Sequence, residues 1–109
     1  AAVPLYPDVL PALVVETLFT FALAFVVLSV ATPKKAAGNS YFGLAIGSTV
    51  MAGAYAAGNI SGAVFNPAVA IGITLMGAGI AANLWIYLVA NLLGGALAAA
   101  VFGLTTPDA

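Results

Sequence analysis

The chain has 109 residues, of which 64% are hydrophobic, with two lysines, three acidic residues, no histidine and no cysteine. Soluble domains carry charge on about a quarter of their positions, so this chain is too apolar to cover a water-facing surface and is typical of an integral membrane protein. The missing residue types exclude disulfides and thiol chemistry, remove the usual metal ligand, and leave no basic surface for nucleic acid. We expect no cofactor.

Residues 1–10 are rich in proline and lack the basic first region of a signal peptide. They predict an extramembrane linker, followed by a single membrane domain over residues 11–109. Because the chain starts at Ala1 and not at Met, we expect it to be processed or to be part of a longer protein.

Three apolar stretches follow in chain order, residues 11–31, 41–57 and 83–104. A helix needs about 20 apolar residues to cross a bilayer, with a range of about 17–25, and each stretch falls in that range. The runs are continuous and do not alternate, which disfavours barrel strands. The predicted fold class is therefore an all-α membrane protein with three transmembrane helices. Lys34 and Lys35, between the first two helices, predict a cytoplasmic loop there.

Residues 58–77, between the second and third helices, predict a re-entrant loop and a half-helix. Asn66 is a favoured N-cap and Pro67 a favoured first helical residue, while Gly77 and Gly79 indicate the end. This helix would be about 18 Å long, roughly half of the hydrocarbon core. Residues 58–65 before it are predicted to be non-helical, and such backbone persists in a membrane only inside protein or beside water.

An external loop with an interfacial helix is the alternative for this segment. Interfacial helices carry a charged polar face, whereas the only polar side chains from residue 66 to 77 are Asn66 and Thr74. The re-entrant interpretation is therefore favoured.

Small residues recur at helical spacing and predict close helix packing. The best of these sets lies in the last predicted helix. The sets are Ala90, Gly94 and Ala98; Gly53 and Ala57; and Gly43 and Gly47.

The loop "SGAVFNPAV" resembles the Asn-Pro-Ala signature of the aquaporins and aquaglyceroporins, the major intrinsic proteins. Residues 16–27, "ETLFTFALAFVV", and 85–99, "WIYLVANLLGGALAA", resemble the opening and closing helices of one three-helix half of that family. The family's fold is an inverted repeat of two such halves. The proline-rich start and the lysine pair are most like a C-terminal half of a bacterial aquaporin, in the inner (plasma) membrane, whereas the ending "NPAV" is usual in first halves.

The resemblance implies a role for each residue of the loop. Asn66 would donate a hydrogen bond to a passing solute, and Pro67 and Ala68 would lock the tips of two opposed loops together. Glu16 would accept hydrogen bonds from the loop backbone; the alternative is a glutamate that extends to the membrane interface. The carbonyls that would line the path belong to Gly62, Val64 and Phe65.

By spacing from the signature Asn, three positions of the family's selectivity filter fall on Ala54, Ala63 and Val69, and the fourth lies in the other half. Water-selective members often carry His at the first of these positions and Arg at the last. Small and apolar residues at all three predict a wider pore that would also pass small neutral solutes such as glycerol.

We therefore expect one half of a channel for water and small neutral solutes, and not an enzyme, because Glu16 and Asp8 have no base, thiol or metal cluster beside them. The second half would be a missing N-terminal part, a separate chain or an inverted copy, and the complete pores would assemble as a tetramer in the lipid bilayer. The alternative is a non-transporting structural subunit, for which Asn66→Ala would be harmless.

Overall fold

The computed structural model describes residues 7–33, 36–77 and 81–107. Its elements, in chain order, are α1 (Val9–Ala31), α2 (Phe42–Ser61), α3 (Pro67–Leu75), the short 3-10 helix η2 (Ala81–Asn83) and α4 (Leu84–Thr105). No strand occurs among the described residues, which confirms the all-α prediction. In the same part of the chain, α1 and α4 are long and apolar enough to cross a membrane, and the 20-residue α2 does not reach that apolarity.

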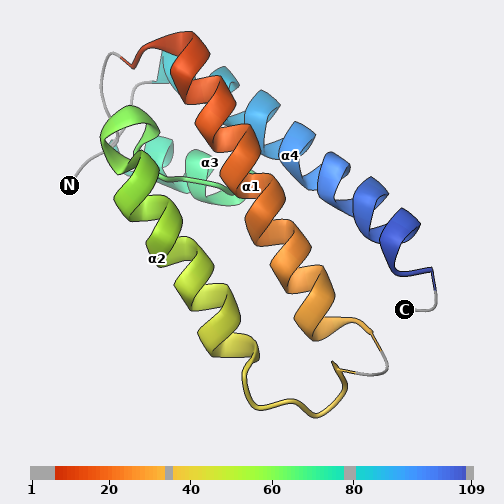
Figure 1. Ribbon diagram of the computed structural model, residues 1–109. Helices are drawn as coiled ribbons and strands as arrows, with labels where there is room; N and C mark the ends of the chain where they lie inside the picture. Colours follow the sequence, from red (N-terminus) through yellow and green to blue (C-terminus); the bar gives the residue numbers. More distant parts are fainter. Residues whose placement is uncertain (1–6, 34–35, 78–80, 108–109) are drawn as a thin grey trace.

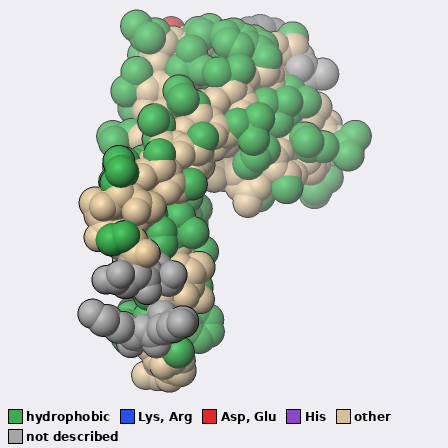
Figure 2. All heavy atoms as spheres, turned by 90° about the vertical axis from the view of Figure 1, so that its right-hand side faces the viewer, with side chains coloured by type: hydrophobic (Ala, Val, Ile, Leu, Met, Phe, Trp, Pro, Cys, Tyr) green, Lys and Arg blue, Asp and Glu red, His purple; other side chains and the backbone are tan. Residues whose placement is uncertain are grey.

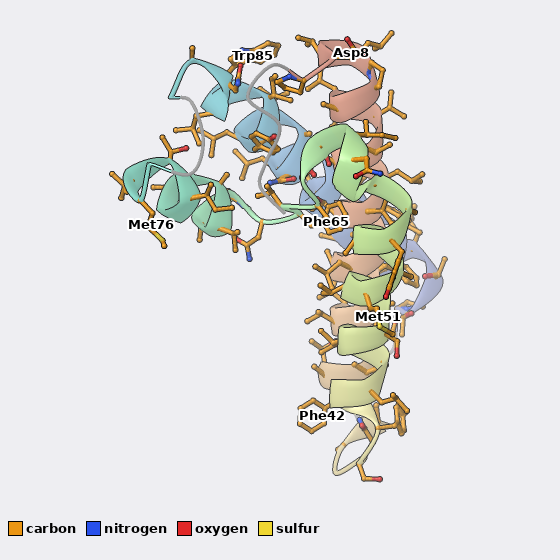
Figure 3. All side chains as sticks on the ribbon, turned by 90° about the vertical axis from the view of Figure 1, so that its left-hand side faces the viewer. Asp8, Phe42, Met51, Phe65, Met76 and Trp85 are labelled. Carbon is orange, nitrogen blue, oxygen red and sulfur yellow. The ribbon has the colours of Figure 1, made fainter. Side chains whose placement is uncertain are left out.

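α1 is the central helix, and both α2 and α4 pack against it (Figure 1). The shorter α3 packs on α4. Asp8 and Trp85 lie at one end of the molecule and Phe42 lies at the other, with Phe65 between them (Figure 3). The loop that carries Phe65 therefore lies between the two ends of the long helices.

The first helix begins at Val9, two residues before the predicted start of the first span at residue 11. Pro11 does not prevent this start, because it lies in the first turn, where a backbone N–H has no partner within the helix. Residues 1–6 lie outside the described residues.

The second helix contradicts the sequence prediction at its C-terminal end. It was predicted to end at residue 57, but it continues to Ser61, so the non-helical prediction is wrong for residues 58–61. Gly58 and Asn59 favour a break by propensity, yet tertiary contacts of Ser61 hold the last turn. The helix ends where Gly62 takes the left-handed conformation, with φ of 89°, that glycine adopts readily.

The third helix begins as predicted at Asn66 and Pro67. The Asn66 side-chain oxygen accepts a hydrogen bond of 2.8 Å from the backbone N–H of Ala68 and so caps the helix. The helix ends at Leu75, shortly before Gly77, whose φ is 76°. The predicted terminal Gly79 and the lysine pair of residues 34–35 lie outside the described residues.

Small residues allow the closest approach between α1 and α4. A Cβ at Gly94 would lie 2.6 Å from the backbone oxygen of Thr17, and Ala90 and Ala98 on the same face are fully buried. By contrast, Gly43 and Gly47 on α2 have nothing within 4 Å of an added Cβ. Hydrophobic side chains are distributed over the face of the molecule shown in Figure 2, as expected for a chain surrounded by lipid.

Candidate functional site: a loop held by a buried carboxylate

A buried carboxylate holds the loop between α2 and α3. Glu16, on α1, has 0% of its surface exposed. Its Oε1 accepts the N–H of Phe65 at 2.8 Å, and its Oε2 accepts the N–H of Val64 at 3.1 Å and the hydroxyl of Ser61. One side chain therefore joins the end of α2 and the loop to α1.

The N–H groups and the carbonyls of residues 62–65 differ in whether they have hydrogen-bond partners within the described residues. The N–H of Ala63 donates to the Ser61 hydroxyl at 3.2 Å, and the N–H of Gly62 donates to the carbonyl of Gly58 at 2.9 Å. With the two bonds to Glu16, all four N–H groups have partners. Among the described residues, no donor reaches the four carbonyl oxygens. Backbone groups away from water are normally paired, so these carbonyls require hydrogen-bond donors from outside the described part of this chain.

The loop backbone is strained at two positions. Ala63 and Phe65 have φ values of 56° and 54°, in the left-handed region that costs a non-glycine residue roughly 1–2 kcal/mol. Such a conformation persists only when its surroundings hold it. Here the bonds to Glu16 hold the backbone, and the Phe65 ring packs on Phe19 with centroids 5.6 Å apart.

Tyr87, on α4, is a residue of this site that the sequence did not single out. Its hydroxyl donates to the carbonyl of Ser61 at 2.7 Å, and its ring packs with Val64 and Ala70. Ser61 is thus held through its hydroxyl by α1 and through its carbonyl by α4. The available signal was a tyrosine inside an apolar span, because a buried phenol usually needs a hydrogen-bond partner.

We predict that Tyr87→Phe lowers the free energy of unfolding by about 1 kcal/mol, because it leaves the Ser61 carbonyl without this donor while the ring packing is kept. The measurement is denaturant unfolding in detergent micelles, followed by circular dichroism. The matched control is Tyr55→Phe, since Tyr55 is 87% exposed and makes no hydrogen bond within the described residues. Equal losses in the two variants would contradict the prediction.

A groove of about 540 Å³ lies beside the tip of the loop. Phe65, Asn66 and Pro67 line it together with residues of α1 and α4. Asn91 of α4 also lines it; its Oδ1 accepts from Thr20 at 2.9 Å, while its buried Nδ2 has no partner within the described residues. The rest of the lining is mainly apolar, so the groove is apolar apart from a few polar groups that include the amides of Asn66 and Asn91.

The predicted signature and filter residues lie around this loop on three elements. Asn66 and Ala68 are exposed and Pro67 is partly buried at the start of α3. The predicted filter residues are Ala54, exposed on α2; Ala63, partly buried in the loop; and Val69, exposed on α3. The described residues contain no group of three acidic, histidine or cysteine side chains that could hold a metal.

Comparison with known proteins identifies the family. The family described as "Major intrinsic protein" matches residues 3–102. The chain is 42% identical over 91 residues to aquaporin NIP3-1 of Arabidopsis thaliana, covering 84% of this chain and 28% of that protein. It is 43% identical over 94 residues to Aquaporin Z of Photorhabdus laumondii, which covers 82% of this chain and 41% of that protein. It is 41% identical over 95 residues to aquaporin TIP2-2 of Zea mays, which covers 86% of this chain and 38% of that protein.

The helical fold and these relatives place the chain in a class of helical membrane proteins. More specifically, the chain belongs to the major intrinsic protein family, which confirms the resemblance found in the sequence. Members of this family are channels and not enzymes, and they reside in membranes. The chain spans about a third of the length of the first curated relatives that it matches. The comparisons give no support to the alternative of a non-transporting subunit.

Proposed function

We propose that this chain forms one half of an aquaporin-type pore that conducts water and small neutral solutes such as glycerol. The observation that carries the proposal is the asymmetry of the loop backbone. Glu16, Ser61 and the carbonyl of Gly58 accept the four N–H groups, and the carbonyls of residues 62–65 remain without donors in the described part of the chain. A row of solute molecules that carry O–H groups, passing along the loop, would supply those donors.

Asn66 would provide the opposite kind of hydrogen bond at the end of this carbonyl row. Its Oδ1 is already engaged by the Ala68 N–H, so its Nδ2 is the group left to donate to a solute oxygen. The positive N-terminal end of α3 lies at the same point. Together they would repel cations and orient water so that proton transfer is interrupted. Pro67 and Ala68 would meet the opposed tip.

The selectivity filter would be wide. Ala54, Ala63 and Val69 add neither charge nor bulk, so the filter would lack the narrowing cationic side chain of water-selective members. We propose that this width admits glycerol-sized neutral solutes, while exclusion of ions depends mainly on the Asn66 region.

A second half must complete the pore, because three long helices and one half-helix cannot enclose a channel. We propose that it fills the groove beside Asn66. The apolar lining of this groove, and the Asn91 Nδ2 that has no partner within the described residues, suit a protein partner better than water or lipid. In this arrangement α2 is the third membrane span, with the loop over residues 32–40 in the cytoplasm. The complete pores would form tetramers in a bacterial inner membrane.

The test is osmotic shrinkage of proteoliposomes, measured by stopped-flow light scattering. We expect shrinkage faster than that of lipid vesicles for the chain alone or, if it requires a partner, for the chain fused to the opposed half of Aquaporin Z. Asn66→Asp should slow it roughly tenfold, the factor that corresponds to 1.4 kcal/mol, because a carboxylate replaces the donor amide. A glycerol gradient on the same vesicles tests the wide filter.

The matched control is Leu75→Ala, an exposed position at the other end of α3 that should leave the shrinkage rate unchanged. Folded protein that conducts in neither form would contradict the proposal, as would an Asn66→Asp variant with the rate of the unsubstituted chain.

A further inference from the structure

The N–H groups of residues 63–65 all point to one side of the loop, toward Glu16. Two of them donate to its carboxylate, and the third donates to the Ser61 hydroxyl, which is itself bonded to that carboxylate. A trans peptide group directs its C=O opposite to its N–H, and no peptide bond among the described residues is cis. The carbonyls of the same three peptide groups, which belong to residues 62–64, therefore point away from Glu16.

The charge behind these peptide groups is negative and is not neutralised within the described part of the chain. Glu16 is fully buried, and Asp8 is the other charged side chain in that part, which contains no Lys, Arg or His. A hydrogen bond to a carboxylate is charge-assisted, and it polarises the peptide group that donates it. The oxygens of Ala63 and Val64 share their peptide groups with the two N–H groups that Glu16 accepts. They therefore carry the effect of its charge to the opposite side of the loop.

Carbonyl oxygens in this state are ligands for cations. Potassium channels use backbone carbonyl oxygens to replace the hydration shell of a monovalent cation. A cation on the Val64 oxygen would lie roughly 8 Å from the Glu16 carboxylate, given the 2.8 Å bond to the Phe65 N–H and the bond lengths of a peptide group. Charges away from water are little screened at such a separation. A cation therefore gains from the charge of Glu16 as well as from the oxygens, whereas a neutral solute gains only from the oxygens.

We propose that the carbonyl oxygens of residues 62–64 bind a monovalent cation of the size of K⁺, and that the bound cation blocks permeation. A divalent ion such as Mg²⁺ gives up its hydration shell reluctantly, so a few neutral oxygens favour the monovalent ion. The inference rests on the proposed function only in placing this row of carbonyls along the solute path.

Two features of the proposed pore make the ion stop at this row. Val69, at the filter position where water-selective members often carry Arg, supplies no positive charge that would keep a cation away. Beyond the row, the positive N-terminal end of α3 begins at Asn66 and opposes further movement. The ion can therefore reach the carbonyls but cannot pass Asn66, and it occupies the path that solutes need.

Binding is tested by NMR, which does not depend on transport. The folded chain in lipid nanodiscs, alone or fused to the opposed half of Aquaporin Z, is titrated with potassium chloride or, in parallel, with N-methyl-D-glucamine chloride. With potassium we expect saturable shifts of the carbonyl carbons of residues 62–64 and of the Val64 and Phe65 amide nitrogens, and no comparable change in the middle of α4. Equal shifts with both salts, or none with either, would overturn the proposal.

The block is measured by osmotic shrinkage of proteoliposomes. Shrinkage in potassium chloride should be several-fold slower than in N-methyl-D-glucamine chloride of the same osmolarity, because the large organic cation does not fit the carbonyl row. Val69→Arg places a fixed positive charge at the filter and should remove both the NMR shifts and the difference between the salts. Val69→Gln is the matched control, because glutamine is long but uncharged, and it should keep both. Each folded variant is compared with its own rate in N-methyl-D-glucamine chloride.

The cation site and the channel fail separately in these experiments. Potassium-dependent shifts in protein that does not conduct would support the cation site while the channel proposal fails. Fast shrinkage at the same rate in both salts would support the channel and overturn the block. A Val69→Gln variant that loses the response to potassium as completely as Val69→Arg would also overturn the proposal, since bulk and not charge would then cause the effect.

Discussion

Glu16→Ala is expected to abolish the pore loop and the permeability that depends on it. The substitution removes the acceptor of three hydrogen bonds and leaves the N–H groups of Val64 and Phe65 and the Ser61 hydroxyl unsatisfied in a buried place. Each unsatisfied buried group costs about 1–3 kcal/mol, so we expect a loss of roughly 3–5 kcal/mol or more. Only the ring contact of Phe65 with Phe19 and the bond from the Ala63 N–H to the Ser61 hydroxyl would then remain, within the described residues, to hold the left-handed conformations of Ala63 and Phe65.

The measurement combines denaturant unfolding in micelles with hydrogen exchange at the amides of Val64 and Phe65. Exchange at these two amides should accelerate in Glu16→Ala more than exchange in the middle of α4. Asp8→Asn is the charge-matched control, because Asp8 is exposed and makes no side-chain cap, and it should behave like the unsubstituted chain. Unchanged protection at positions 64 and 65 would refute this account of the loop.

Gly94→Ala is expected to separate α1 from α4 and to destabilise the whole bundle. The new Cβ would lie 2.6 Å from the Thr17 carbonyl oxygen, 2.9 Å from the Thr20 Cβ and 3.0 Å from the Phe21 nitrogen. Two of these atoms belong to the backbone, so no side-chain rotation relieves the overlap, and overpacking of this kind costs about 1–3 kcal/mol. Because Thr17 adjoins Glu16, the displacement should also disturb the loop.

The neighbouring glycine supplies the matched control. A Cβ at Gly95 meets nothing within 4 Å, so Gly95→Ala should leave stability unchanged or raise it by up to about 1 kcal/mol through helix propensity. Both variants are compared by thermal unfolding in the same detergent. If Gly94→Ala is as stable as Gly95→Ala, the close approach of α1 and α4 is not a determinant of stability.

The helices and the start of α3 could be predicted because their signals are local. Continuous apolar runs mark α1 and α4, and the order of Asn66 and Pro67 marks a helix start in any context. The end of α2 could not be predicted in this way. Gly58 and Asn59 carry a local preference for a break, and a long-range contact between Ser61 and Glu16 overrides it.

The backbone of the loop was also beyond prediction from the sequence. Nothing local marks Ala63 or Phe65 for a positive φ, since neither is glycine or asparagine. Their conformation depends on a carboxylate supplied by another helix. Glu16 itself was recognisable, because an acidic residue inside an apolar span is costly and seldom incidental. Tyr87 was not singled out: a phenol inside an apolar span signals a need for a hydrogen-bond partner, but the sequence does not show that the Ser61 carbonyl is that partner.

The hydrogen bonds between Glu16 and the distant loop have a consequence for biosynthesis. Glu16 and the Phe65 amide that it binds are 49 residues apart. At a translation rate of about 5–20 residues per second, α1 exists for roughly 2–10 s before its carboxylate can find those amides. A carboxylate exposed to lipid for that time is unfavourable, so we expect α1 to leave the insertion machinery together with α2 and the loop. The nascent chain would then enter the bilayer as a hairpin, and a ribosomal pause after residue 31 should promote its misinsertion.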